Sequence, residues 1–409
     1  MPEDTKIGGN HFSVGGVLLD RPFRIRRLGH FGLDVRDIEA GVKFYTEMFG
    51  LKIADPIDFG SRLPPEEQGK HGPSVGYFMR HGTDHHSFVL FPIRVRRMML
   101  RHLGENMTIN QITWQVGSLR EVVEGSGWLK ETGIKIARAG RDNPGSNWHA
   151  YPLDPEGHTN EIYYGIEQIG WDGLSKPKGM HRRDYHQSPT LPHRSEFAEV
   201  EEGFEAGVDI LKANRFKEPL EETYDVGGIL LARPFKVTKI GPIRIFVKDV
   251  EDVTTFYRDA MGLKVTEEVV WNGHRCVFLR ANNEHHSLAI YPAALREELG
   301  LSPHTSLFSC GFQVADYTQL RNAVSFLQEK GVTVRKLPPE LFPGIDYSAF
   351  AIDPDGHAIQ LYYYMEQIGW DGRPMPASQR RKIDNENWPE YVPAQTDTYN
   401  GEVYLGPWN

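Results

Sequence analysis

Cysteine is almost missing from this chain, since Cys276 and Cys310 are the only two among 409 residues and they form no Cys-x-x-Cys pair. A disulfide framework and a thiolate zinc site are therefore poor interpretations. Long apolar runs are missing as well, because none approaches the roughly 20 residues that a membrane-spanning helix needs. The first residues, Met1 to Ser13, lack the charged-then-apolar layout of a signal peptide. We therefore expect a protein of the reducing cytoplasm with no membrane partner.

A basic surface is also lacking. The 46 lysines and arginines are outnumbered by 55 aspartates and glutamates, which gives a formal net charge of −9. This balance does not favour nucleic acid or anionic lipid as a partner. The 39% of hydrophobic and 25% of charged residues are ordinary for a globular protein, and the length allows two to four domains.

The sequence does contain an internal repeat. Residues 15–23 (GGVLLDRPF) return as 227–235 (GGILLARPF), and residues 167–173 (EQIGWDG) return unchanged as 366–372. Within each copy, a pattern of strand, helix and three strands occurs twice. The sequence thus predicts two tandem domains at 14–173 and 226–372, a linker at 174–225 with one helix at 195–214, and a tail at 373–409.

Four strand positions of the first copy have counterparts in the second. Because a strand points alternate side chains to one face, all four can face the interior of a curved sheet. In the first copy they offer N and O donors to a divalent metal, and histidine with carboxylate suits non-haem Fe(II), and also Mn or Zn. In the second copy most of these donors are lost. The aligned pairs are His30 with Pro242, His86 with His286, Gln111 with Ser309 and Glu161 with Gln360.

Several motifs resemble those of a known family. Residues 151–161 (YPLDPEGHTNE) are similar to a Y-x-x-D-P-x-G-x-x-x-E pattern, and residues 84–87 and 284–287 are similar to an H-H-S segment. Leu28-Gly29-His30 resembles the segment that gives the first metal histidine. Through these motifs the chain resembles the vicinal-oxygen-chelate superfamily, in particular the two-domain type I extradiol ring-cleavage dioxygenases. The resemblance implies an α+β fold, with four βαβββ modules paired into two tandem domains with curved, mainly antiparallel sheets.

The resemblance also implies roles for single residues. It assigns His30 and Glu161 to the metal, His86 to acid–base chemistry near the O2 site, and Tyr151 to the active site. Further residues expected to line the substrate pocket are Asp142, Trp148 and His149.

This sequence departs from the family pattern in two ways. The expected metal site lies in the first copy, whereas the family normally has it in the second, and two site positions carry other residues. Gln111 stands where the family has its second metal histidine, and Asp142 stands where it has a substrate-side histidine. Either His86 moves onto the metal as the third ligand, or Gln111 ligates through its amide oxygen and leaves His86 as the acid–base group. We prefer the second alternative, because His286 persists in a copy without metal ligands.

The expected function is that of a metal-dependent oxygenase, most simply an Fe(II) enzyme that cleaves the ring of a catecholic or related aromatic diol with O2. Two alternatives are a Zn-, Mn- or Ni-dependent isomerase or lyase and a protein that only sequesters a ligand. The expected partners are a small aromatic substrate and O2, and the chain is expected to form a homo-oligomer. The loop at 55–74 is about 12 residues longer than its counterpart and is expected to join the pocket or a lid. His85 and His158 are expected to face away from the site.

Overall fold

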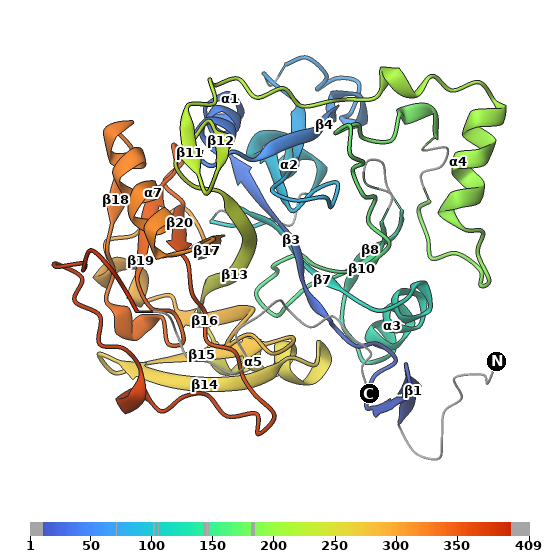
Figure 1. Cartoon of the computed structure of the whole chain (residues 1–409). Helices are drawn as coiled ribbons and strands as arrows, with labels where there is room; N and C mark the ends of the chain where they lie inside the picture. Colours follow the sequence, from blue (N-terminus) through green and yellow to red (C-terminus); the bar gives the residue numbers. More distant parts are fainter. Residues whose placement is uncertain are drawn as a thin grey trace.

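Two eight-stranded sheets of the same design, flanked by helices, form the bulk of the molecule (Figure 1). The computed structural model describes residues 11–70, 72–100, 103–104, 106–141, 145, 147–180 and 185–393. In Figure 1 the first domain is blue to green and the second is yellow to red, and their central strands lie side by side.

The elements follow one another in the same order in both domains. The first contains β3 (Arg27–Val35), α1 (Ile38–Lys43), β4 (Lys52–Asp58), β5 (Val75–Arg80), β6 (Phe88–Pro92), α2 (Ile93–Met99), β7 (Ile109–Gln115), α3 (Leu119–Glu131), β8 (Ile136–Arg141), β9 (Trp148–Pro152) and β10 (Asn160–Tyr164). The second contains β13 (Val237–Val247), α5 (Val250–Thr255), β14 (Lys264–Trp271), β15 (His274–Arg280), β16 (Leu288–Pro292), α6 (Leu295–Glu298), β17 (Leu307–Val314), α7 (Tyr317–Glu329), β18 (Val334–Arg335), β19 (Ser348–Ile352) and β20 (Ala358–Tyr362). A short hairpin precedes each domain: β1 (Phe12–Val14) with β2 (Val17–Leu19), and β11 (Tyr224–Val226) with β12 (Ile229–Leu231).

The strand order is β4-β5-β6-β3-β7-β10-β9-β8 in the first sheet and β14-β15-β16-β13-β17-β20-β19-β18 in the second. Antiparallel pairing of β3 with β7 joins two βαβββ modules, whereas β3 with β6 and β7 with β10 pair in parallel. The register places Gly32 opposite Gln111, and it places Arg244 opposite Ser309 in the second sheet. The prediction of an α+β fold with two tandem domains and mainly antiparallel sheets is confirmed.

Aspartate side chains start the first helix of each domain. Asp37 before α1 and Asp249 before α5 each accept a hydrogen bond from a backbone N–H three residues further on, which satisfies one of the free N–H groups of a helix start. Both helices continue as a π-helical turn, Phe44–Met48 and Phe256–Ala260. Both helices therefore begin after a capping aspartate, and their second halves are wound more loosely.

The linker helix is shorter than the predicted range of 195–214. Helix α4 spans Glu196–Glu205 and a separate 3-10 turn covers Ile210–Lys212. Gly207 between them has a φ of 73°, a left-handed conformation that ends helices. In Figure 1 α4 lies at the outer edge of the first domain, away from the second.

The two domains share a hydrophobic core and a symmetric set of hydrogen bonds. Phe312 of the second domain packs against Phe49 and Phe88 of the first, with ring centroids 5.1 and 5.7 Å apart. The two D-P-x-G-H turns lie in this contact, so the aspartates that shape the turns also bind the other domain. The cross-domain hydrogen bonds are Tyr45 to Asp353 (2.9 Å), Tyr257 to Asp154 (3.3 Å), His158 to Ser306 (3.0 Å) and His357 to Thr108 (2.9 Å).

The longer loop of the first domain replaces a tight hairpin of the second. Between β14 and β15 the chain turns at Asn272 and Gly273, whose φ values of 48° and 82° are those of a two-residue turn. Between β4 and β5 it forms a 3-10 turn at Gly60–Arg62. Phe59 and Leu63 at this turn are buried in a small apolar cluster, which holds the insertion against the sheet.

None of the helices in the described parts of the chain combines the length and the apolar character that crossing a bilayer would require.

Candidate active site

A cavity of about 170 Å³ opens on the first sheet. Side chains from both modules of the domain reach it, because the antiparallel pairing of β3 and β7 brings the two modules together. It gathers residues that are up to 131 positions apart in the sequence. The predicted site residues on its wall are His30, His86, Gln111, His149, Tyr151 and Glu161.

His30 on β3 and Glu161 on β10 face each other inside this cavity. Nε2 of His30 lies 3.1 Å from Oε2 of Glu161, and Asn147 donates to the other carboxylate oxygen at 2.6 Å. Burial alone would raise the pKa of the Glu161 carboxyl, but the charge and hydrogen bond of His30, with His149 and Arg138 nearby, hold that pKa below its ordinary value. Glu161 is therefore a buried carboxylate in its charged form.

This pair fits a divalent metal. Two ligand atoms that each lie about 2.1 Å from a metal, at a right angle, are about 3 Å apart, close to the observed 3.1 Å. The side chains of His30 and Glu161 are only 1% and 0% exposed. Nδ1 of His30 is buried and has no hydrogen-bond partner among the described residues. Imidazole nitrogen with carboxylate oxygen suits Fe(II), Mn or Zn.

The third ligand was open between His86 and Gln111, and both side chains line the cavity. The ring centroids of His86 and His30 are 4.3 Å apart. Within the described chain, however, the ligand atoms of His30, His86 and Glu161 do not form a group with all atoms inside 4.8 Å, a spacing met only by a cluster in the second domain. Gln111 lies opposite Gly32 in the register and has an amide oxygen to offer. Gln111 as the third ligand stays a prediction.

On the side away from the cavity, His86 forms a hydrogen bond with another histidine, His85. Nδ1 of His86 lies 3.1 Å from Nδ1 of His85, and Nε2 of His85 lies 2.8 Å from Oδ2 of Asp55. Burial, with His30 and His85 close by, keeps the pKa of His86 well below its usual value, so the ring is neutral. His85 does face away from the cavity, as expected, but it contacts the residue that lines it.

Trp148 does not line the cavity, and this corrects the sequence prediction. Along β9, His149 and Tyr151 share one face, so Trp148 lies on the opposite face by strand alternation. Its ring packs against Tyr185 and His193 of the linker, with both centroid distances at 4.8 Å. The other predicted pocket residue, Asp142, lies outside the described residues.

Several cavity residues were not predicted from the sequence. Asn147 shares the face of His149 and Tyr151, so the same alternation could have identified it. Phe59 and Arg62 come from the longer loop, which therefore contributes to the pocket wall. Helix α2, the residue that follows it and strand β8 had no recognisable site motif, yet they supply Met99, Leu100, Arg96 and Arg138.

In the second domain the equivalent space is filled. Arg244, at the position of Gly32, is fully buried, and its guanidinium donates to Nε2 of His286 at 3.0 Å and to Ser309 at 3.4 Å. Where the first domain has Asn110 bonded to Asp34 at 2.7 Å, the second has two stacked aromatic rings 4.9 Å apart. These rings, which belong to a larger apolar cluster, are Phe246 and Phe308.

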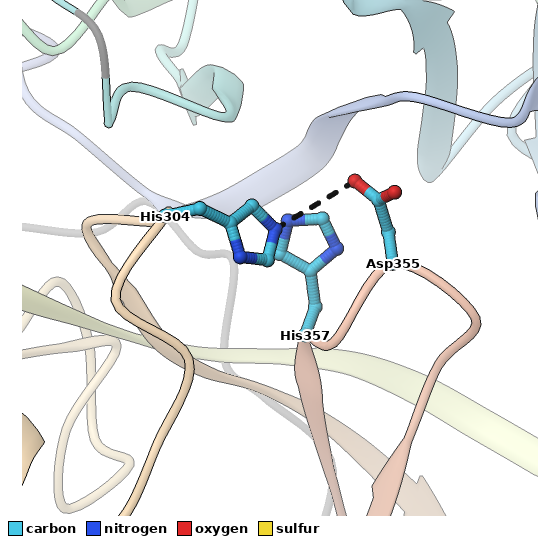
Figure 2. A group of neighbouring side chains, drawn as sticks. All are labelled: His304, Asp355 and His357. Carbon is cyan, nitrogen blue, oxygen red and sulfur yellow. Dashed lines mark ion pairs between the residues drawn. The ribbon is translucent and has the colours of Figure 1, made fainter.

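His304, Asp355 and His357 form a separate cluster with ligand atoms within 4.8 Å of one another (Figure 2). By residue type it can hold an ion, but two of its groups already have partners in the first domain. Asp355 accepts hydrogen bonds from Nε and the backbone N–H of Arg36 at 2.8 and 3.3 Å, and the His357 ring bonds to Thr108. Nε2 of His304 and Oδ2 of Asp355 are 3.7 Å apart. We interpret this cluster as part of the domain contact.

Tandem domains of paired βαβββ modules, with polar side chains gathered on one sheet, are the architecture of vicinal-oxygen-chelate proteins. The chain belongs to the Glyoxalase/Bleomycin resistance protein/Dioxygenase superfamily, whose model matches residues 27–162 and 239–361. The two matched regions coincide with the two eight-stranded sheets.

Two curated relatives, a dioxygenase and a metapyrocatechase by name, match parts of the chain. One is a 2,2',3-trihydroxybiphenyl dioxygenase of Sphingomonas paucimobilis, 24% identical over 130 residues, or 32% of this chain and 42% of that protein. The other is metapyrocatechase 2 of Cupriavidus necator, 26% identical over 184 residues, or 44% and 50% of the two chains. The matches thus span half or less of each relative.

Solved structures share the fold over both domains. A Mn(II)-bound glyoxalase from Novosphingobium aromaticivorans has a TM-score of 0.53 at 16% identity, with 85% of each chain covered. Homoprotocatechuate 2,3-dioxygenase from Brevibacterium fuscum, in complex with 3,4-dihydroxyphenylacetate, has a TM-score of 0.54 at 14% identity and covers 87% of this chain and 86% of its own. At these identities the likeness extends to the fold alone.

Proposed function

We propose that the protein is an extradiol-type dioxygenase, which cleaves the ring of a catecholic or related aromatic diol with O2, and that its active site is the cavity of the first domain. The observation that carries this proposal is the buried pair of His30 and Glu161 in a cavity that also contains His86 and Tyr151. Both atoms of O2 would enter the product, a ring-opened semialdehyde-type acid. The two ring-cleavage relatives support the proposal.

His30, Gln111 and Glu161 would hold the metal, with Fe(II) as the first choice and Mn(II) or Zn(II) as alternatives. When bound, Fe(II) would supply the Lewis acidity and the affinity for O2 on which ring cleavage depends. The neutral ring of His86 takes the proton of a substrate hydroxyl and returns it as the ring opens. Tyr151 donates a hydrogen bond to the oxygen on which negative charge develops.

The charge of the cavity wall indicates the class of diol. Glu161, which is used by the metal, is the one carboxylate among the described lining residues, whereas Arg62, Arg96 and Arg138 are three cations. The Arg138 guanidinium lies 4.5 Å from the ring centroid of Tyr151, so positive charge lies beside the proposed substrate. A substrate with an acidic substituent would complement this wall. We therefore propose a diol that carries a carboxylate or a similar anionic group.

A second candidate function is a Zn-, Mn- or Ni-dependent isomerase or lyase that does not use O2. It is favoured by Gln111, because an amide oxygen in the ligand set departs from the ring-cleavage pattern. Metal analysis of the purified protein and the dependence of turnover on O2 separate the two functions.

The proposed function is tested by loading the protein with Fe(II) under argon and measuring O2 uptake with catechols that differ only in an acidic substituent. We expect one O2 consumed per diol cleaved and faster turnover of the acidic members. Glu161→Gln should abolish both metal binding and O2 uptake, whereas Glu284→Gln, a buried carboxylate of the second domain, should leave both unchanged. Uptake with none of the diols by a metal-loaded protein would contradict the proposal.

A further inference from the structure

We propose that Asp55 and His85 are positioning residues that fix the tautomer of His86, so that Nδ1 carries its proton and the lone pair of Nε2 faces the cavity. The inference rests on the proposed function, because it explains how His86 is prepared to accept a substrate proton. It goes beyond that function in assigning a role to two residues that do not line the cavity.

The first observation is a continuous chain of hydrogen bonds behind the cavity. Oδ2 of Asp55 lies 2.8 Å from Nε2 of His85, and Nδ1 of His85 lies 3.1 Å from Nδ1 of His86. A carboxylate only accepts hydrogen bonds, so Nε2 of His85 carries a proton. If His85 is neutral, its Nδ1 is an acceptor, and His86 must donate from Nδ1. Nε2 of His86 is then left with its lone pair.

The alternative is a doubly protonated His85, which would donate to His86 and reverse its tautomer. The second domain distinguishes the two forms, because it contains the same chain. There Glu267 lies 3.0 Å from Nε2 of His285, and the two Nδ1 atoms of His285 and His286 are 3.0 Å apart.

The guanidinium of Arg244 completes the chain in the second domain, 3.0 Å from Nε2 of His286. A guanidinium only donates, so Nε2 of His286 must accept. His286 therefore donates from Nδ1, and Nδ1 of His285 accepts. His285 is consequently neutral and donates from Nε2 to Glu267 at 3.0 Å, so the guanidinium of Arg380, 3.3 Å from the same Nε2, donates to Glu267 and not to the ring. Arg244 thus fixes the direction of these hydrogen bonds in the second domain, and we infer the same direction for the matching hydrogen bonds of Asp55, His85 and His86.

Residues outside the sheets lie against Asp55 and Glu267, the carboxylates at which the two series of hydrogen bonds begin. In the first domain Asn214 of the linker donates to the backbone oxygen of Ala54 at 2.6 Å, next to Asp55. Asp55 also borders a surface hollow between β4 and the linker, and its side chain is 13% exposed, which keeps a charged carboxylate hydrated. In the second domain Arg380 of the tail donates to Glu267 at 2.7 and 3.0 Å. Segments outside the two sheets therefore position both acids.

The direct test is histidine nitrogen NMR on the full-length, metal-free protein with labelled histidines, in which the His86 signals are assigned by their loss in His86→Gln. Wild-type protein should show a proton on Nδ1 and a bare Nε2 for His86. In Asp55→Asn the amide can donate to His85, so the His86 tautomer should shift toward Nε2–H. A wild-type His86 protonated on Nε2, or an unchanged tautomer in Asp55→Asn, would overturn the proposal.

Kinetics provide a second readout with a matched control. Asp55→Asn should lower kcat by about 10- to 100-fold, the usual effect of losing a partner that orients a site histidine, with little change in KM. Asp55→Glu should restore part of that loss. Glu267→Gln should leave kcat unchanged and His286 in its tautomer, because Arg244 still donates to it. Equal kcat losses in Asp55→Asn and Glu267→Gln would overturn the positioning role.

The two proposals fail separately. The NMR measurement needs neither metal nor substrate, so a wild-type His86 with bare Nε2 that shifts in Asp55→Asn upholds the positioning role even if no diol is cleaved. Conversely, cleavage of a diol together with an unchanged tautomer upholds the proposed function and overturns the positioning role. Should Asp55→Asn not fold, His85→Gln measured for kcat and KM takes its place with the same expected loss in kcat.

Discussion

The guanidinium of Arg244 lies 3.0 Å from Nε2 of His286, at the position that Gly32 occupies in the first domain. This position, opposite Gln111 in one sheet and Ser309 in the other, is one of those at which the interiors of the two domains differ. The second domain retains the histidine pair, and it has a buried cation and stacked aromatic rings where the first domain has Gly32, Asp34 and Asn110.

Replacing Arg244 should therefore affect the stability of the second domain and not the chemistry of the first. Arg244→Ala leaves a cavity and removes the hydrogen-bond donor of His286, so we expect a loss of about 2–4 kcal/mol in the free energy of unfolding. Arg244→Met keeps most of the volume and removes a buried charge, so its cost should be about 1 kcal/mol or less. Denaturant titration gives both values. A drop in metal affinity in either variant would contradict the separation of roles.

The choice between Gln111 and His86 as third ligand is decided by two variants. We expect Gln111→Leu to lower metal affinity by more than about 10-fold, because it removes an oxygen donor next to the metal. His86→Gln should leave metal affinity unchanged and lower kcat by about 100-fold or more, the scale of general acid–base catalysis. Metal affinity is measured by competition with a chelator. His286→Gln is the control, and the reverse pattern would identify His86 as the ligand.

Arg62 of the longer loop should contribute to the binding of an anionic substrate. Arg62 is exposed and stacks on Phe59 with 4.9 Å between Cζ and the ring centroid. We expect Arg62→Met to raise KM for a carboxylate-bearing catechol up to about five-fold, since an exposed ion pair contributes at most about 1 kcal/mol. KM for a neutral catechol should not change. Arg94→Met, an exposed arginine of α2 that does not line the cavity, is the control, and an equal effect on both substrates would argue against an anionic group.

Asp355 should make the free energy of unfolding depend on pH below about 4. Burial would raise the pKa of this carboxyl, but the nearby ring of His304 and the guanidinium of Arg36, which donates a hydrogen bond, lower it from 3.8 to about 2. A carboxyl whose pKa is lower in the folded state stabilises it above the unfolded value, and this contribution is lost as the pH falls from about 4 to about 2.

The corresponding variant is Asp355→Asn. Its partner Arg36 is 62% exposed, so solvent screening reduces the contribution to the order of 1 kcal/mol. We expect the variant to lose about that much stability at neutral pH and to show a flatter stability profile between pH 4 and 2. Urea unfolding at a series of pH values measures both, with Glu201→Gln on the exposed face of α4 as control. An unchanged slope would mean that Asp355 is not the titrating group.

Much of this protein could be read from its sequence. The duplicated segments, the repeated strand–helix–strands pattern and the alignment of His30 with Pro242 predicted two domains of equal design. The prediction succeeds because the pairing of β3 with β7 requires the same alternation of side chains in both copies. The motif at 151–161 also predicted that Glu161 and Tyr151 lie in the same cavity, because a D-P-x-G turn fixes the register of the two strands that flank it.

Other features were decided by the tertiary structure. Trp148 looked like a pocket residue from its place in the chain, but it lies on the other face of β9 because it is an odd number of residues from Tyr151. Arg96 and Arg138 reach the cavity from elements without a motif. Histidine pairs appear in both copies of the sequence, and only the contacts with Asp55, Glu267 and Arg244 show what orients them.

The sequence by itself determined the scaffold, because local patterns of alternation, capping and turn residues repeat in it and act over short distances. It also identified the copy that keeps a histidine and a carboxylate. The tertiary structure decided how the site is assembled: that His30 and Glu161, 131 residues apart, lie 3.1 Å from each other, and that Arg244 contacts His286 inside the second domain. Such contacts depend on which side chains face one another across packed strands, and sequence distance does not contain that information.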